Sequence, residues 1–143
     1  DHRDLHSFPT RRSSDLRRIV VENACRDVVF YSDPVLLRRV VGNMVKNALE
    51  ATPAGGEIRL GCRPLADAME FAVQNAGVIP RSVQMRIFSR SFSTKGVGRG
   101  LGTYSIKLLT ERYLGGRADF VSNREEGTVF RVRLPLTLPP DLA

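Results

Sequence analysis

Two asparagines, Asn43 and Asn47, lie four residues apart inside one apolar segment, and this spacing constrains the chain more than any other feature. The surrounding apolar residues repeat with the period of an amphipathic helix, so both amides fall on the same helix face. A buried amide without a partner costs about 1–3 kcal/mol. Because Mg²⁺ takes oxygen ligands and shares its shell with water and phosphates, two amides on one face are suited to a Mg²⁺ site.

A glycine-rich basic segment, residues 95–102, follows further along the chain and runs directly into a second expected helix. Glycines allow backbone N–H groups to approach phosphate oxygens, and a helix start favours an anion. Lys95 and Arg99 are suited to neutralise a triphosphate, although solvated loop charges are the plain alternative. The glycines concerned are Gly98, Gly100 and Gly102. Together with the two asparagines, this segment predicts a Mg–nucleotide site.

Residues 1–16 match the in-frame translation of a short-read sequencing adapter at every position. We therefore interpret them as an adapter-derived artefact and exclude them from the fold, as one excludes a tag; a genuine basic arm is the alternative. His2 and His6 both lie in this segment, so no histidine remains outside it. We expect the natural sequence to begin near Arg17 and to be a fragment of a longer protein.

Composition narrows the class of protein. The net charge is +7, but the arginines are spread along the chain with few aromatic residues between them. This favours a solvated basic surface with a phosphate site over a nucleic-acid partner. Cys25 and Cys62 are far apart and have no metal-binding spacing, which is typical of a reduced cytosolic setting. We therefore expect a cytoplasmic domain. No apolar run is long enough to span a membrane, and membrane anchoring of the full-length protein is left open.

The hydrophobic pattern predicts alternating strands and helices. Asp33 and Pro34 have the chemistry of an N-cap and a first helical residue, so a helix is expected from Pro34 to near Thr52. Further helices are expected over residues 80–88 and 101–114, and strands over residues 28–31, 57–63, 69–74, 117–122 and 128–134. The sum is an α+β fold, a two-layer sandwich whose mostly antiparallel sheet is covered on one face by helices.

The apolar positions of the two long helices predict the core. These positions are Leu36, Leu37, Val40, Val41, Met44, Val45, Ala48, Leu49, Leu101, Ile106, Leu108, Leu109 and Tyr113. Phe88 and Phe92 are expected to pack a loop base against this core. We place one domain over residues 17–137 and a loose tail over 138–143.

Five segments, in this order, resemble the conserved boxes of the catalytic ATP-binding domain of sensor histidine kinases. The fold of that domain, the Bergerat fold, is shared with gyrase-type ATPases and heat-shock chaperones. The segments are residues 43–52 (N box), 73–80 (first glycine box), 87–95 (F box), 98–102 (second glycine box), and 127–130 with Leu134 and Pro135 (closing strand).

The resemblance assigns roles to individual residues. It makes Asn47 the Mg²⁺ ligand, and it places Asn43 where hydrolytic relatives hold a glutamate that activates water. An amide is no general base, so Asn43 favours phosphoryl transfer to a protein over hydrolysis; a purely structural amide is the alternative. Asn43 and Lys95 are the candidate catalytic residues. The phosphate-side residues are Lys95, Gly98, Arg99, Gly100, Leu101 and Gly102.

The first glycine box departs from the family pattern. Asn75 stands where the family has an aspartate that accepts from the adenine amino group, and the second glycine after Gly77 is missing. The Asn75 carbonyl is able to accept from adenine N6 while its NH₂ donates to N1; a turn-forming asparagine is the alternative. Gln74 offers a competing register. Thr128 matches the family's other adenine-side contact.

The resemblance implies ATP and Mg²⁺ as cofactors, and transfer of the γ-phosphate to a histidine on an upstream dimerisation domain missing from this fragment. The phosphate would then pass to a response regulator, and the full-length protein would be a homodimer. One alternative is a degenerate, non-catalytic docking module on the same fold. Another is an ATPase switch or an anti-sigma-factor-type serine kinase, which needs a base such as Glu50 near the γ-phosphate.

Overall fold

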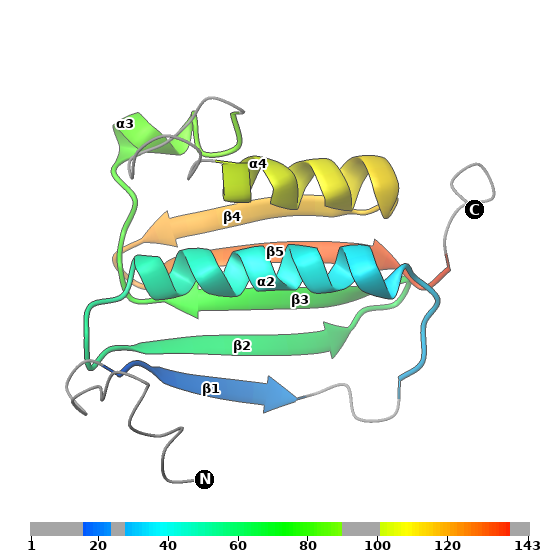
Figure 1. The fold of residues 1–143 in the computed structure, drawn as a ribbon, viewed down its shortest axis with the longest axis horizontal. Coiled ribbons are helices and arrows are strands. Elements are labelled where there is room, and N and C mark those ends of the chain that lie inside the picture. Colours follow the sequence, from blue (N-terminus) through cyan, green and yellow to red (C-terminus); the bar gives the residue numbers. More distant parts are fainter. Residues whose placement is uncertain (1–15, 24–27, 90–100, 138–143) are drawn as a thin grey trace, which may run out of the picture.

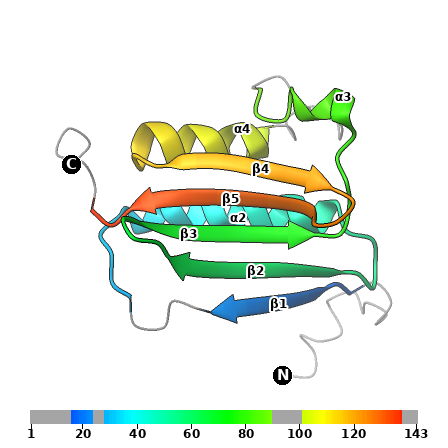
Figure 2. The same cartoon turned by 180° about the vertical axis from the view of Figure 1, so that it is seen from behind.

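A computed structural model describes residues 16–23, 28–89 and 101–137 of the chain. A five-stranded sheet in the order β1-β2-β3-β5-β4 is covered on one face by helices, with β1 parallel to β2 and the other neighbours antiparallel. Figures 1 and 2 show the helices on one side of the sheet only. The strands are β1 (Arg18–Asn23), β2 (Glu57–Pro64), β3 (Ala68–Asn75), β4 (Arg117–Asn123) and β5 (Gly127–Pro135). The helices are α2 (Pro34–Glu50), α3 (Arg81–Gln84), α4 (Leu101–Leu108) and the π-helical turn η2 (Leu109–Tyr113). The predicted α+β sandwich is confirmed.

Helix α2 begins as its sequence predicts. The Asp33 carboxylate accepts from the backbone N–H groups of Val35 (2.9 Å) and Leu36 (3.1 Å), which satisfies two donors that the helix leaves unpaired. The helix buries the stripe Val40, Met44 and Ala48 against the sheet. Asn43 and Asn47 each precede a residue of this stripe and therefore lie along its edge.

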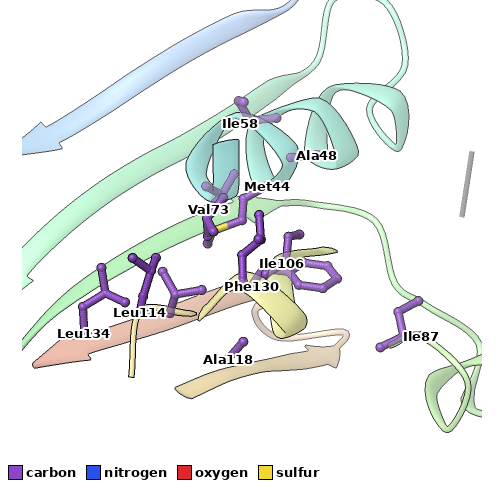
Figure 3. Close-up of a cluster of buried hydrophobic side chains, with 13 residues drawn as sticks. Met44, Ala48, Ile58, Val73, Ile87, Ile106, Leu114, Ala118, Phe130 and Leu134 are labelled. Atoms are coloured by element: carbon purple, nitrogen blue, oxygen red, sulfur yellow. The ribbon is translucent and has the colours of Figure 1, made fainter. Parts of the chain in front are cut away.

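The core lies between the helices and the sheet. Met44 of α2 meets Val73 of β3, and Ile106 of α4 lies near Phe130 of β5 (Figure 3). All four residues are less than a tenth exposed. This packing fixes α2 and α4 on the same layer, where they also contact each other.

Phe88 closes this core at the end of the described F-box segment. Its ring packs edge-on against Phe120 and Phe130, with centroids 5.6 and 6.0 Å away. The packing predicted for Phe88 is confirmed, whereas Phe92 lies outside the described residues.

The end of α4 differs from a regular helix. Leu114 N–H donates to the carbonyl of Leu109, five residues earlier, and Gly115 ends the turn with a φ of 71°. Tyr113 was predicted to be in the core, but it is 55% exposed, because the wide turn places Leu114, fully buried, at the core position instead. The Tyr113 prediction is wrong.

The predicted strand over residues 28–31 is also wrong. Val29 and Tyr31 are mostly exposed, and Tyr31 N–H donates to the carbonyl of Leu136 rather than into a ladder. The edge strands of the sheet are β1 and β4, and residues 28–31 pair with neither.

Charged side chains cover part of the sheet face that carries no helices. The buried Glu70 carboxylate accepts from Arg63 (2.7 Å) and Arg133 (2.9 Å), and Arg133 also donates to Asp119 (3.0 Å). Burial on its own raises the pKa of Glu70, but the two guanidinium groups outweigh it and hold that pKa below its usual value.

Candidate functional site

Four chain segments that are distant in sequence meet at one end of the sandwich. They are the C-terminal end of α2, the end of β3, the start of α4 and the start of β5, all at the left of Figure 1. Contacts of Asn47, Asn75, Gly77, Gly102 and Thr128 connect these segments. The described parts of the segments matched to the N box, the two glycine boxes and the closing strand therefore converge; of the second glycine box these are Leu101 and Gly102.

Asn47 and Gly102 form the junction between α2 and α4. A Cβ built on Gly102 would lie 3.4 Å from Oδ1 and 3.8 Å from Nδ2 of Asn47. Nδ2 of Asn47 is buried and has no hydrogen-bond partner within the part of the chain that the structure describes. A buried amide left unpaired needs an explanation, and a ligand is one of the few available. Because Gly102 has no side chain, the backbone of α4 can approach this amide closely.

The residues present at this junction fit a Mg²⁺ ion shared with a nucleotide. No group of three or more His, Cys, Asp or Glu side chains able to hold a metal exists among the described residues. Mg²⁺ commonly takes only one or two protein oxygens, with water and substrate phosphates completing its octahedral shell. Only the oxygen of the Asn47 amide can bind a cation, because Nδ2 is a hydrogen-bond donor, and a half-turn of the amide exchanges the two atoms.

The other candidate residues of α2 lie on either side of Asn47. Asn43 is half-buried and lies one turn earlier, on the same side of the helix. Glu50 is exposed at the last residue of the helix. Both amides therefore lie along α2 as their spacing predicted.

Asn75, Gly77 and Thr128 form a second group at the same end. Asn75 lies opposite Thr128 in the β3–β5 register, and both are buried. The Thr128 hydroxyl donates to the Gly77 carbonyl at 2.8 Å. A Cβ built on Gly77 would lie 3.1 Å from Nδ2 of Asn75 and 3.6 Å from the carbonyl of Ala51, at the end of α2.

Ser122 completes this group and was missed by sequence reasoning. Its hydroxyl lies 2.8 Å from that of Thr128 and accepts from the backbone N–H of Ile79 at 2.7 Å. Since Thr128 donates to Gly77, Ser122 donates to Thr128, and every hydroxyl is satisfied. The signal that identifies Ser122 is its place opposite Thr128 in the β4–β5 register.

Strand alternation separates the two registers that the sequence offered. The Gln74 side chain points to the face without helices, where it donates to the carbonyl of Glu126. Asn75, one residue on, lies on the helix side beside Gly77. The geometry thus puts Asn75, and not Gln74, next to the other first-glycine-box residue.

The backbone of Asn75 is held by an unusually close neighbour, Gly127. Gly127 has a φ of 71°, and a Cβ built on it would lie 2.2 Å from the Asn75 carbonyl oxygen. Only glycine fits this position without a shift of the backbone. The sequence placed Gly127 in the closing-strand segment, and the folded chain shows why this position is a glycine.

The remaining site predictions fall on the glycine-rich basic segment, residues 95–102, which we call the lid. Lys95, Gly98, Arg99 and Gly100 lie outside the described residues, and Leu101 is the first residue of α4.

Within the described ranges, no helix is long and apolar enough to cross a membrane.

This fold, with an asparagine-bearing helix beside a glycine at the start of a second helix, defines the Bergerat class of nucleotide-binding domain. Comparison with known proteins agrees: residues 32–138 match the family described as histidine kinase-, DNA gyrase B-, and HSP90-like ATPase. The chain belongs to this family.

Among curated relatives, the sensor protein VanSB of Enterococcus faecalis is 26% identical over 93% of this chain and 31% of its own length. The sensor histidine kinase CusS of Escherichia coli is 32% identical over 72% of this chain and 22% of its own length. The chain thus spans less than a third of either relative.

Among solved structures, the catalytic domain of histidine kinase ThkA is 31% identical, with a TM-score of 0.75 over 86% of this chain and 82% of that one. A second ThkA structure, in complex with the response regulator protein TrrA, is 29% identical, with a TM-score of 0.70 over 85% of this chain and 34% of that one. The chain is therefore a histidine-kinase-type ATP-binding domain.

Proposed function

We propose that the chain binds Mg–ATP and donates the γ-phosphate to a histidine on a separate dimerisation domain. The observation that carries this proposal is the buried Nδ2 of Asn47, which lies beside Gly102 and has no hydrogen-bond partner among the described residues. Asn47 would hold Mg²⁺ through its oxygen, and Mg²⁺ would neutralise charge on the phosphates. The start of α4, at Leu101 and Gly102, would receive phosphate oxygens at its free N–H groups.

The other proposed contacts divide into a phosphate side and a base side. On the phosphate side, Lys95, Gly98, Arg99 and Gly100 would surround the triphosphate. On the base side, Asn75 would pair with adenine, while Gly77 and Thr128 would line the pocket, a role that the Thr128–Gly77 hydrogen bond supports.

Asn43 supports transfer rather than hydrolysis. It occupies α2 one turn before Asn47, and its amide has no basic atom with which to activate water. Phosphoryl transfer depends mostly on positioning and charge neutralisation, so Asn43 and Lys95 would act by positioning the γ-phosphate.

The proposed partners lie outside the described residues. The acceptor histidine would belong to an upstream dimerisation domain of a homodimeric, cytoplasmic kinase module, and the phosphate would pass on to a response regulator. The ThkA–TrrA complex supports a response-regulator partner for a domain of this kind.

Labelled ATP tests the proposal. With γ-labelled Mg–ATP, the chain alone should bind nucleotide, transfer no label to itself and release phosphate slowly. The same chain joined to the upstream sequence of its own gene should place the label on a histidine, and Asn47→Ala should abolish this labelling. Gly100→Val should also weaken binding, because its side chain would block the lid backbone.

Two results would contradict the proposal. Rapid phosphate release by the chain alone, unchanged in Asn47→Ala, would indicate hydrolysis at another site. A folded chain that binds no ATP would favour the docking-module alternative instead.

A further inference from the structure

Asn75 is 5% exposed, and its side-chain amide forms no hydrogen bond with the residues that the structure describes. The neighbouring amide of Gln74 is different, because it donates to the carbonyl of Glu126 on the other face of the sheet. Asn75 thus presents its amide beside Gly77, at the base side of the proposed nucleotide site.

An unpaired amide can turn about its Cβ–Cγ bond and exchange its oxygen with its NH₂ group. In one orientation the oxygen accepts from the adenine N6 amine while the NH₂ donates to N1. In the other orientation the NH₂ donates to a purine O6 while the oxygen accepts from N1–H. Both orientations form two hydrogen bonds, one with a 6-aminopurine and one with a 6-oxopurine.

A carboxylate at this position would behave differently. An ionised aspartate accepts hydrogen bonds but donates none, so it faces a purine O6 with two acceptors and no proton between them. A polar group left unpaired in this way lowers the affinity for the nucleotide by about 10- to 100-fold. The choice between amide and carboxylate at residue 75 therefore sets the selectivity for the purine.

We propose that Asn75 makes this site accept 6-oxopurine nucleoside triphosphates as well as ATP. The inference rests on the proposed function, because it requires that the base bind beside residue 75. Asn75 is then the residue that determines base specificity, and its backbone position is fixed by the close approach of Gly127.

Inosine triphosphate is the appropriate probe, because it differs from ATP only at the purine C6 and N1 edge. We expect the wild-type chain with Mg²⁺ to bind it within about tenfold of ATP, since both pairings contain two neutral hydrogen bonds. Asn75→Asp should weaken inosine triphosphate relative to ATP by about 10- to 100-fold. Gln74→Glu makes the same amide-to-carboxylate change on the opposite face and should leave the ratio unchanged.

Three results overturn the inference. One is wild-type binding of ATP more than about 100-fold tighter than inosine triphosphate, beyond what one neutral pairing explains. Another is an unchanged ratio of the affinities for inosine triphosphate and ATP in the Asn75→Asp variant, when thermal melting shows that this variant is folded. If that variant does not fold, Asn75→Ala replaces it: it should bind both nucleotides more weakly at an unchanged ratio, and retention of full affinity for either overturns the inference.

The third is binding of neither nucleotide by the folded wild-type chain, which overturns the proposed function as well. The two failures are distinguishable. Mg-dependent ATP binding that is lost in Asn47→Ala but shows strong selection against inosine triphosphate leaves the proposed function standing and removes only the role of Asn75.

Discussion

Gly127→Ala should destabilise the fold and disturb the base side of the site together. Gly127 begins β5 with a φ of 71°, and a Cβ there would lie 2.2 Å from the Asn75 carbonyl oxygen and 3.0 Å from Cα of Ala76. Contacts this short with backbone atoms require the chain itself to move. The end of β3, which carries Asn75, is the part that must yield.

The magnitude follows from two separate costs. A left-handed conformation costs a non-glycine residue about 1–2 kcal/mol. Forcing an extra carbon into a well-packed position costs about 1–3 kcal/mol more. We therefore expect Gly127→Ala to lower the free energy of unfolding by about 2–5 kcal/mol, a large part of the total for a small domain.

Gly55 provides the matched control, because its φ is 81° and a Cβ there would meet nothing within 4 Å. Gly55→Ala should therefore cost only the conformational term, about 1–2 kcal/mol. Denaturant unfolding measures both values, and ATP titration at a temperature where both variants are folded measures the effect on the site. Equal destabilisation by the two substitutions, or unchanged ATP affinity in Gly127→Ala, would refute the reasoning.

Three further predictions follow from other contacts. Glu70→Gln should cost about 1–3 kcal/mol at neutral pH, because it removes the carboxylate that Arg63 and Arg133 share. The pKa of Glu70 is lowered by folding, so this stabilisation is present above its unfolded pKa and is lost as pH falls through the folded pKa. From pH 7 downward, the free energies of unfolding of the wild-type chain and of Glu70→Gln should converge below about pH 4. A constant difference between the two proteins would contradict this role of the Glu70 carboxylate. Thr128→Val should lower the free energy of unfolding by about 1–3 kcal/mol and weaken ATP binding, because the Gly77 carbonyl loses its hydrogen-bond donor. Thr128→Ser keeps the hydroxyl and should change neither quantity. Equal behaviour of the two variants would contradict a role for the Thr128 hydroxyl. Gly102→Ala should raise the free energy of unfolding by up to about 1 kcal/mol, because its Cβ meets only ordinary contacts. The same Cβ would lie against the Asn47 amide and should weaken Mg–ATP binding. A variant with unchanged stability and unchanged Mg–ATP affinity would contradict the assignment of the Asn47–Gly102 contact to the nucleotide site.

Local chemistry made the helix that carries the site predictable. Asp33 and Pro34 determine where α2 begins, and the four-residue spacing of Asn43 and Asn47 places both amides on one side of it. The antiparallel strands were also predictable, because each has alternating apolar residues and a turn signal between it and its neighbour.

Non-local pairing was not predictable in the same way. Strand β1 pairs in parallel with a strand far along the chain, and Ile19 and Val21 remain about half or more exposed, so the apolar pattern gives little sign of a sheet edge. Residues 28–31 have a strand-like apolar pattern but no partner. In a regular α-helix Tyr113 would face the core, but the chain forms a π-helical turn there and leaves Tyr113 exposed.

The candidate site was likewise predictable from the sequence only in part. The types of residue at Asn47, Asn75 and Gly102 indicated their chemistry, and the family resemblance assigned their roles. The contact between Asn47 and Gly102 depends on how α2 packs beside α4. Ser122 joins the site through strand register, and the close approach of Gly127 to Asn75 depends on how β5 packs beside β3; no local sequence pattern encodes either contact.

Calorimetric titration of the chain with ATP, with and without Mg²⁺, tests the central claim most directly. Asn47→Ala is the test variant, and Gln74→Ala, which removes an amide on the opposite face of the sheet, is the control. Mg²⁺ should strengthen ATP binding by the wild-type chain and the control, and this Mg-dependent part should be lost in Asn47→Ala while the fold is retained. Equal Mg dependence in all three proteins would contradict the assignment of Asn47 as the metal ligand.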